Sequence, residues 1–209
     1  MIRMQVAAIS PDTEAEGPGL RYALWFQGCP LRCPGCCNPE YLPFTGGETR
    51  TLDAIVLEIQ KSREENGIEG ITLLGGEPFA HAEPAAAIAE AAHSLGLSVM
   101  VFSGLTLEDL RTSSTIDPAK AALLARTDIL VDGPYVREQP DTTRRWIGST
   151  NQRIHFLSGR YRADDPAWEK PNTLEIRVSG HEVLVNGFPA GGATGLWKGW
   201  KRKKGVPNP

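Results

Sequence analysis

Residues 21–36 read RYALWFQGCPLRCPGC, a short apolar run followed at once by three cysteines. The run at residues 21–26 is rich in aliphatic and aromatic side chains and has the length of a buried β-strand. The turn-forming residues Glu16-Gly17-Pro18-Gly19 precede it. The cysteines are therefore expected just beyond the carboxyl end of a strand, where they would lie at an edge of the sheet.

The spacing of Cys29, Cys33 and Cys36 is C-x3-C-x2-C. All four cysteines of the chain lie between Cys29 and Cys37, so they cannot join distant parts of the fold as a disulfide framework does. Soft thiolates select iron-sulfur clusters or zinc, and a structural zinc site ordinarily takes a fourth ligand from a second knuckle, which the sequence does not offer. Three thiolates on one loop suit three irons of a [4Fe-4S] cubane, with the fourth iron free of protein ligands.

Cys37 is the remaining cysteine. As the direct neighbour of Cys36, it cannot easily turn its sulfur to the same cubane, and we interpret it as a packed or idle thiol. If it were a fourth ligand, the cluster would be saturated and the protein would be an iron-sulfur electron carrier. An iron-sulfur electron carrier is therefore our alternative from another functional class.

The sequence after the cysteines predicts an α/β fold. Residues 52–59 have helical spacing behind the N-cap candidate Thr51, and residues 70–74 form a strand that ends in Gly75-Gly76-Glu77-Pro78. Strands and helices then alternate, which is typical of a parallel sheet with right-handed crossovers, either open or a partial barrel. The further expected elements are helices at 84–95, 106–111 and 118–126, strands at 97–102, 128–132 and 153–157, the last closing the sheet, and a hairpin at 174–178 and 182–185.

Composition narrows the functional classes. The chain has 209 residues, 41% of them hydrophobic, and a net charge of −3, so one globular domain is expected and nothing demands a nucleic-acid partner. No apolar run is long enough to span a bilayer and the first residues lack a signal-peptide core, so we expect a cytoplasmic protein without a membrane partner. Residues 197–204 combine Trp197 and Trp200 with five basic residues and could bind a nucleic acid, but we favour a solvated tail.

The cysteine spacing together with Gly75-Gly76-Glu77 after the next strand resembles the radical S-adenosylmethionine (SAM) superfamily. The resemblance implies a partial (β/α) TIM-like barrel at residues 1–157, followed by a small extension with a β-hairpin and a basic tail at 158–209. It implies two cofactors, a [4Fe-4S] cluster on Cys29, Cys33 and Cys36, and SAM. In that family SAM chelates the open iron, and the Gly-Gly-Glu segment binds its methionyl ammonium, a role that suits close backbone approach and a carboxylate. Gly35 departs from the family pattern, because many members carry an aromatic residue before the last ligand.

A narrower resemblance, over roughly residues 16–155, is to the activases of glycyl radical enzymes, particularly those of anaerobic ribonucleotide reductase. It implies reductive cleavage of SAM to methionine and a 5′-deoxyadenosyl radical, which takes a hydrogen from a glycine α-carbon of a partner enzyme, with reduced flavodoxin or ferredoxin as electron donor. The matching segments are Gly17-Pro18-Gly19-Leu20-Arg21, Cys36-Cys37-Asn38-Pro39-Glu40, Val101-Phe102-Ser103-Gly104, Asp132-Gly133-Pro134-Tyr135 and Gly148-Ser149-Thr150-Asn151-Gln152-Arg153-Ile154.

The runner-up is a radical SAM enzyme that acts on a small molecule or a peptide, because fold and cluster motif are shared by enzymes with unrelated substrates. Deazaguanine-forming enzymes are one such group, but they usually carry Asp-Thr where this chain has Cys37-Asn38. The region after residue 155 is not covered by the resemblance. We expect it to recognise the hydrogen donor.

Two further polar residues are candidates for the SAM site. Ser103 and Asp132 follow later strands, where an α/β sheet places ligand groups, and they are predicted to contact the SAM ribose, its carboxylate or a nearby cation. Capping of the strand ends is the competing interpretation. Arg21, Asn38 and Asn151 have similar but weaker claims.

Overall fold

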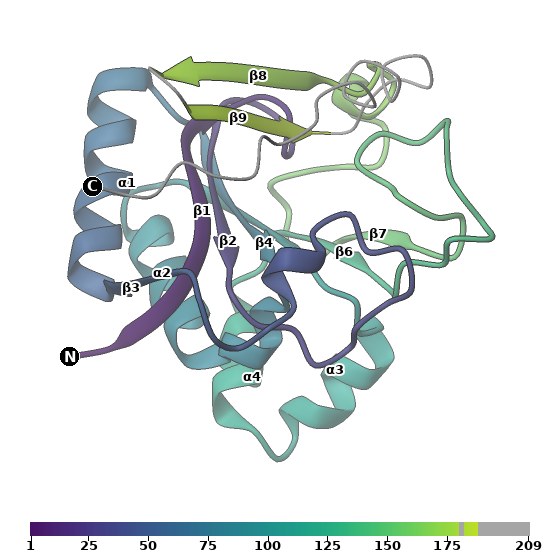
Figure 1. Cartoon of the computed structure of the whole chain (residues 1–209), viewed down its shortest axis with the longest axis horizontal. Coiled ribbons are helices and arrows are strands. Elements are labelled where there is room, and N and C mark those ends of the chain that lie inside the picture. The colour runs from purple at the N-terminus through teal and green to yellow at the C-terminus, as the bar shows by residue number, and fades with distance from the viewer. Residues whose placement is uncertain (180–181, 188–209) are drawn as a thin grey trace, which may run out of the picture.

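The computed structural model describes residues 1–179 and 182–187, and a seven-stranded sheet lies at its centre (Figure 1). Four neighbouring strands of this sheet are parallel, as the alternation of strands and helices predicted. They are β2 (Arg21–Phe26), β4 (Gly70–Gly75), β5 (Ser98–Phe102) and β6 (Ile129–Asp132), in that spatial order. Because they are parallel, their carboxyl ends meet at one edge of the sheet.

Both margins of the sheet are antiparallel. Strand β1 (Arg3–Thr13) pairs with β2 and with β3 (Glu48–Thr51), and β7 (Arg153–Phe156) pairs with β6. The sequence analysis missed β1 and β3. The strand predicted at 153–157 is confirmed as β7, but it ends the sheet as an outer strand, so among the described residues the sheet is open. The fold is therefore a mixed α/β fold around an open central sheet.

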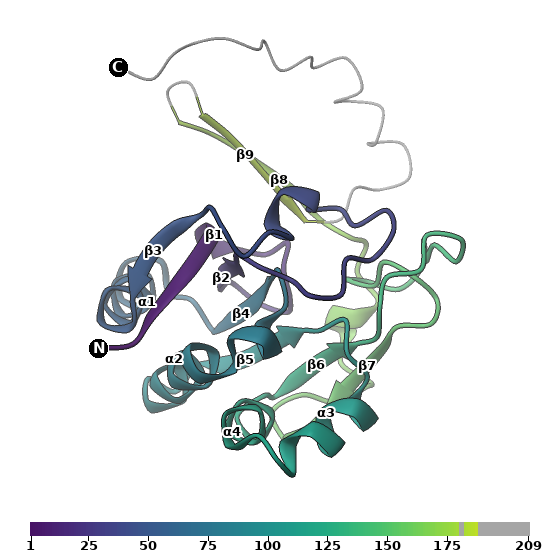
Figure 2. The same cartoon turned by 60° about the horizontal axis from the view of Figure 1, so that its bottom comes forward.

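Four α-helices cover one face of the sheet, as Figure 2 shows. They are α1 (Leu52–Asn66), α2 (Ala82–Ser94), α3 (Leu107–Ser114) and α4 (Pro118–Ala125). Three of them begin at side chains that accept a backbone N–H of the first turn: Thr51, Thr106 and Asp117. In the described part of the chain, no helix combines the length and the apolar character that crossing a bilayer requires.

Side chains of the parallel strands alternate between two cores. In β2, Tyr22, Leu24 and Phe26 pack in the large core beneath the helices, whereas Ala23 and Trp25 face the other side of the sheet. On that other side, the fully buried Trp146 packs with Met100, Ile129 and Val131. In the described part of the chain, this second face is therefore also covered, by irregular chain and the short helix η3 (Pro166–Trp168) rather than by a layer of α-helices.

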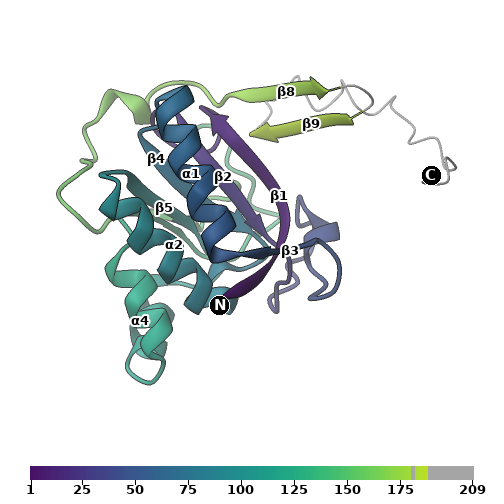
Figure 3. The same ribbon diagram turned by 90° about the vertical axis from the view of Figure 1, so that its left-hand side faces the viewer.

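The C-terminal hairpin is confirmed. Strands β8 (Leu174–Ser179) and β9 (Glu182–Gly187) pair antiparallel and stand beside the carboxyl end of β1 (Figure 3). Asn186 Nδ2 donates to Thr13 Oγ1 at 2.8 Å, and the backbone N–H of Gly187 donates to Glu16 Oε1 at 2.7 Å. The hairpin is thus attached to the β1–β2 connection, at the amino ends of the parallel strands. The predicted basic tail lies outside the described residues, and the boundary between residues 157 and 158 stays a prediction.

A buried arginine marks the same end of the sheet. The side chain of Arg21 is fully buried, and it donates to Thr72 Oγ1 at 2.8 Å and to the carbonyl of Ile71 at 2.6 Å. Tyr161, from the segment before the hairpin, places its hydroxyl 2.8 Å from Ser98 Oγ and 3.4 Å from Arg21 Nη1. Residues of the predicted extension therefore complete a polar network inside the core.

Replacing Tyr161 with phenylalanine should lower the free energy of unfolding by about 1 kcal/mol, because Ser98 and Arg21 lose a hydrogen-bond partner in a buried setting. Urea denaturation of the two proteins measures this. Tyr135→Phe is the matched control, since the Tyr135 hydroxyl makes no hydrogen bond to another residue in the described ranges. Equal denaturation midpoints for Tyr161→Phe and the wild type would show that the segment around Tyr161 packs loosely on the core.

Candidate metal centre

The cysteine loop leaves the carboxyl end of β2 and returns to it. The backbone N–H groups of Gly28 and Cys29 donate to the carbonyls of Tyr41 and Leu42 at 2.8 and 3.0 Å. Gln27 Nε2 donates to the carbonyls of Glu40 and Pro43, on either side of the same returning segment. The loop between these contacts, which ends in the short helix η1 (Pro39–Tyr41), is therefore held at its base and carries all four cysteines.

The three predicted ligands differ in exposure. Cys29 is buried, Cys33 and Cys36 are half-buried, and the Cys36 N–H donates to the Cys33 carbonyl at 3.2 Å, which closes a tight turn between them. The turn uses left-handed backbone at Gly35, where φ is 78°. Among the described residues, no three side chains of the Cys, His, Asp or Glu type are gathered as a metal site in the conformation of the structure. The loop therefore brings the cysteines to one edge of the sheet, but their sulfur atoms do not point to a common centre in this conformation.

The donor set nevertheless fits an iron-sulfur cluster. A hydrogen bond from the neighbouring Cys37 thiol lowers the pKa of Cys36 to about 6, and burial raises the pKa of Cys29. Cys37 itself is exposed. Three sulfur ligands on one loop, two of them accessible, match the number that a cubane with one open iron requires.

The Gly75-Gly76-Glu77 segment lies directly against the base of the cysteine loop. The N–H of Gly76 donates to the Phe26 carbonyl at 2.7 Å, and the N–H of Glu77 donates to the Gly28 carbonyl at 3.0 Å. A Cβ atom on Gly76 would lie 2.2 Å from the Gly28 carbonyl oxygen, so only glycine permits this approach. The structure therefore brings together the two motifs that the sequence separates by about forty residues, because β2 and β4 are parallel neighbours.

The Glu77 carboxylate is only 1% exposed and has several protein donors. Oε1 accepts from the N–H of Phe79 and from Ser103 Oγ, both at 3.0 Å, and Oε2 accepts from the N–H of Gly104 at 2.8 Å. Burial raises the pKa of Glu77, and these three hydrogen bonds oppose the rise. Glu77 thus joins the end of β4 to the end of β5, and it keeps lone-pair capacity for one further donor.

Asp132 is bound by other parts of the protein. Its Oδ2 accepts from the Leu107 N–H and from Arg153 Nη2, both at 2.6 Å, and His155 Nε2 lies 3.1 Å from the same oxygen. Although burial acts in the opposite direction, hydrogen bonds from Arg153 and from the Leu107 N–H hold the pKa of Asp132 below its ordinary value. These contacts are those of a strand-end cap that joins β6 to α3 and β7. A contact of Asp132 with SAM stays a prediction.

The weaker candidates are dispersed. Arg21 lies at the amino end of β2, away from the cysteines, and its contacts are those of the buried network described above. Asn38 precedes η1 and makes no side-chain capping hydrogen bond. Asn151 Nδ2 donates to the Pro134 carbonyl at 2.8 Å and so fixes the loop after β6.

Sequence reasoning missed three residues at this edge. Gly104 supplies the backbone donor to Glu77, and His81 places Nε2 3.2 Å from the Gly28 carbonyl while it stacks on Phe26. Arg137 lies against Gly35, with Cδ 3.0 Å from the position that a Cβ on that glycine would take. Gly104 was quoted within a motif, but nothing in the sequence indicates that His81 or Arg137 returns to the cysteine loop.

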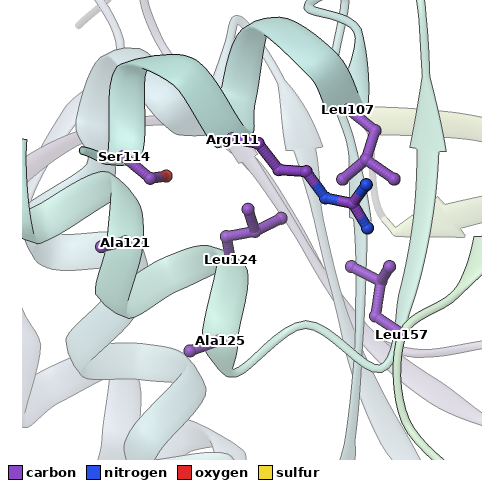
Figure 4. Close-up of a pocket in the computed structure, with 7 residues that line it drawn as sticks. All are labelled: Leu107, Arg111, Ser114, Ala121, Leu124, Ala125 and Leu157. Carbon is purple, nitrogen blue, oxygen red and sulfur yellow. The ribbon is translucent and has the colours of Figure 1, made fainter.

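A shallow hollow lies elsewhere, between α3 and α4 (Figure 4). Apolar side chains form most of its wall, with Arg111 reaching across towards Leu157. The hydroxyl of Ser114, which also lines it, is buried without a hydrogen-bond partner among the described residues. None of the predicted cluster or SAM residues lines this hollow.

Comparison with known proteins places these features in a family. The family described as a 4Fe-4S single cluster domain matches residues 15–155, which include every cysteine. The anaerobic ribonucleoside-triphosphate reductase-activating protein of Vibrio cholerae serotype O1 is 31% identical over 153 residues, 69% of this chain and 93% of the relative. The protein of the same name from Escherichia coli strain K12 is 30% identical over 155 residues, 70% of this chain and 95% of the relative.

Among solved structures, QueE from Escherichia coli aligns with a TM-score of 0.37 and 16% identity, over 51% of this chain and 55% of that one. The sequence matches are the informative ones, because the relatives are covered over nearly their whole length and the family match contains the complete cysteine loop and the Gly-Gly-Glu segment. The chain belongs to the 4Fe-4S single cluster domain family and to the family of anaerobic ribonucleoside-triphosphate reductase-activating proteins.

Proposed function

We propose that this protein is a radical SAM activase that installs a glycyl radical on an anaerobic ribonucleoside-triphosphate reductase. The observation that carries the proposal is the contact between Gly76, Glu77 and the base of the cysteine loop, made through two backbone hydrogen bonds of 2.7 and 3.0 Å. It sets the Glu77 carboxylate beside the base of the loop that carries the three thiols. The relatives named as activating proteins of that reductase support the choice of partner.

Cys29, Cys33 and Cys36 would hold a [4Fe-4S] cluster, and the base of the loop would fix its position relative to β4. A cluster bound there would supply the one electron that the reductive cleavage of SAM to methionine requires. The 5′-deoxyadenosyl part of SAM would leave as 5′-deoxyadenosine with one hydrogen atom from a glycine α-carbon, and a glycyl radical would remain on the partner. The chemistry belongs to the cofactors, whereas the protein supplies binding and orientation.

The chain's own residues then have defined tasks. Glu77, held by Phe79, Ser103 and Gly104, presents a fixed carboxylate oxygen to the methionyl ammonium of SAM. Gly75 and Gly76 would contact SAM through their backbone, since the places of their missing Cβ atoms are already taken by Trp25, Phe26 and Gly28. Ser103 acts through Glu77, since its hydroxyl donates to Oε1, and Asp132 holds the neighbouring strand end through Arg153. Pre-organised polar groups of this kind lower the cost of orienting the bound molecule.

The proposal also states that the fold is a partial (β/α) barrel and names an electron donor. The carboxyl ends of β2, β4, β5 and β6 supply the cysteine loop, Glu77, Ser103 and Asp132 in that order around one rim, the arrangement that a partial (β/α) barrel uses for its ligands. Reduced flavodoxin or ferredoxin is proposed as the physiological reductant, with the reaction taking place in the cytoplasm.

The test uses the reconstituted full chain under anaerobic conditions with SAM, a chemical reductant and a purified anaerobic ribonucleoside-triphosphate reductase that contains α-deuterated glycine. We expect deuterium in the 5′-deoxyadenosine that is formed, because the hydrogen comes from a glycine α-carbon. Reductase with unlabelled glycine is the control. Formation of 5′-deoxyadenosine without deuterium would overturn the choice of hydrogen donor, and the small-molecule or peptide alternative would replace it. No cleavage of SAM by a fully loaded cluster would instead favour the electron carrier.

A further inference from the structure

Arg137 lies across the turn that joins two of the predicted cluster ligands. Its Cδ is 3.0 Å, and its Cβ and Cγ are 3.4 Å, from the position that a Cβ on Gly35 would occupy. Gly35 stands between Cys33 and Cys36, whose backbones are hydrogen-bonded to each other at 3.2 Å. The aliphatic part of Arg137 therefore covers bare glycine backbone, where a larger residue would collide with it.

The segment that carries Arg137 is held in place from both sides. The N–H of Val136 donates to Ser149 Oγ at 3.1 Å, the N–H of Gln139 donates to the Val136 carbonyl at 3.0 Å, and the N–H of Thr150 donates to the Gln139 carbonyl at 2.8 Å. At the base of the same loop, Gln152 Nε2 donates to the Gly133 carbonyl at 3.0 Å. Arg137 is thus presented to the cysteine loop by a braced segment, and the Asp132-Gly133-Pro134-Tyr135 and Gly148–Ile154 motifs supply the bracing.

The charge of Arg137 has no competing partner in the described ranges. The side chain is exposed, and no carboxylate among these residues forms an ion pair with it. Two carboxylates have the opposite effect on the cysteines. The negative charge of Glu77 acts to raise the pKa of Cys29, and that of Glu40 acts to raise the pKa of Cys36. Arg32 lies within the loop, between Cys29 and Cys33, and Arg137 adds a second positive charge from a distant part of the chain.

We propose that Arg137 is a positioning residue that makes the cluster easier to reduce, by holding a positive charge over the Cys33–Cys36 turn. The inference rests on the proposed function, since it takes these cysteines as ligands of a [4Fe-4S] cluster. The reduction potential of such a cluster depends on the net charge and the solvent exposure around it. A cation beside the ligands stabilises the extra electron, so its loss shifts the potential to more negative values.

The test is an anaerobic potentiometric titration of the reconstituted full chain, with the reduced cluster read by electron paramagnetic resonance (EPR) and with neither SAM nor reductase present. At a fixed potential near the midpoint, the ratio of reduced to oxidised cluster in Arg137→Gln should be about twofold lower than in the wild type, which is the effect in water of a unit charge taken to act over roughly 9 Å. Arg137→Lys should restore the wild-type ratio. Arg63→Gln, which removes an exposed arginine from α1, is the matched control and should change nothing.

Iron and sulfide are counted first in every variant, so a failure of cluster assembly is separated from a shift in potential. High salt should lower the wild-type potential towards that of Arg137→Gln, because exposed charges are screened. The salt dependence of the wild-type potential still tests the inference if Arg137→Gln does not assemble a cluster. Equal potentials for Arg137→Gln and Arg63→Gln, or a wild-type potential that does not respond to salt, would overturn the inference. Neither readout depends on whether a glycyl radical is formed.

Discussion

Replacing Cys33 with alanine should abolish cluster assembly. Cys33 and Cys36 close one turn of the loop, and with Cys29 they supply the three thiolates for three irons. Reconstituted wild-type protein should contain about four irons and four sulfides per chain, and the variant fewer than about one iron. Iron and sulfide analysis, together with the visible absorption of the cluster, measures the difference.

Cys37→Ala is the matched control for that experiment, because it removes an exposed thiol one residue from a ligand. It should retain the full iron content and the cleavage of SAM. A cluster that Cys33→Ala still assembles, or that Cys37→Ala loses, would mean that the ligand set is wrong. In the second case Cys37 would be a fourth ligand, and an electron carrier would become the better account.

Replacing Glu77 with glutamine should weaken SAM binding about tenfold or more, since it removes the charge proposed to meet the methionyl ammonium. The structure adds a second effect. Glutamine keeps the shape of the side chain, but its amide nitrogen would face the N–H of Gly104 or the donors Phe79 and Ser103, which now meet carboxylate oxygens. We therefore also expect a loss of about 1–3 kcal/mol in the free energy of unfolding.

The two effects are separated by measuring SAM affinity on folded, cluster-loaded protein and stability by denaturation. Ser103→Ala is the control, because it removes one of the three donors to Glu77 and leaves the charge in place. It should lower SAM affinity less than Glu77→Gln does. Unchanged SAM affinity in Glu77→Gln would leave Glu77 as a purely structural link between β4 and β5.

The placement of the two motifs could be predicted from the sequence, and the details of the site could not. Parallel strands put Cys29 and Glu77 at one edge, because both follow the carboxyl ends of neighbouring strands. The hydrogen bond from Ser103 to Glu77 depends on how two loops meet, which no local pattern encodes. The contact of Arg137 with Gly35 joins residues about a hundred positions apart, and only the folded loop after β6 brings them together.

The strands also divide into those that the sequence predicted and those that it did not. Strands β2, β4, β5 and β6 are buried apolar runs, which the sequence marks clearly. Strand β1 was missed because its alternation is irregular, with two breaks in its register against β2 and a proline within it. Strand β3 has no buried residue, so it carries no hydrophobic signal, and only its pairing with β1 makes it a strand.

The central claim is tested most directly by EPR of the partner enzyme. The reconstituted protein is mixed anaerobically with SAM, reductant and an anaerobic ribonucleoside-triphosphate reductase, and the spectrum of the separated reductase is recorded. The account predicts the doublet of a glycyl radical on the reductase, absent when Cys33→Ala replaces the wild-type activase. A reductase that stays without a radical signal, although the wild-type chain holds a complete cluster and cleaves SAM, would contradict it.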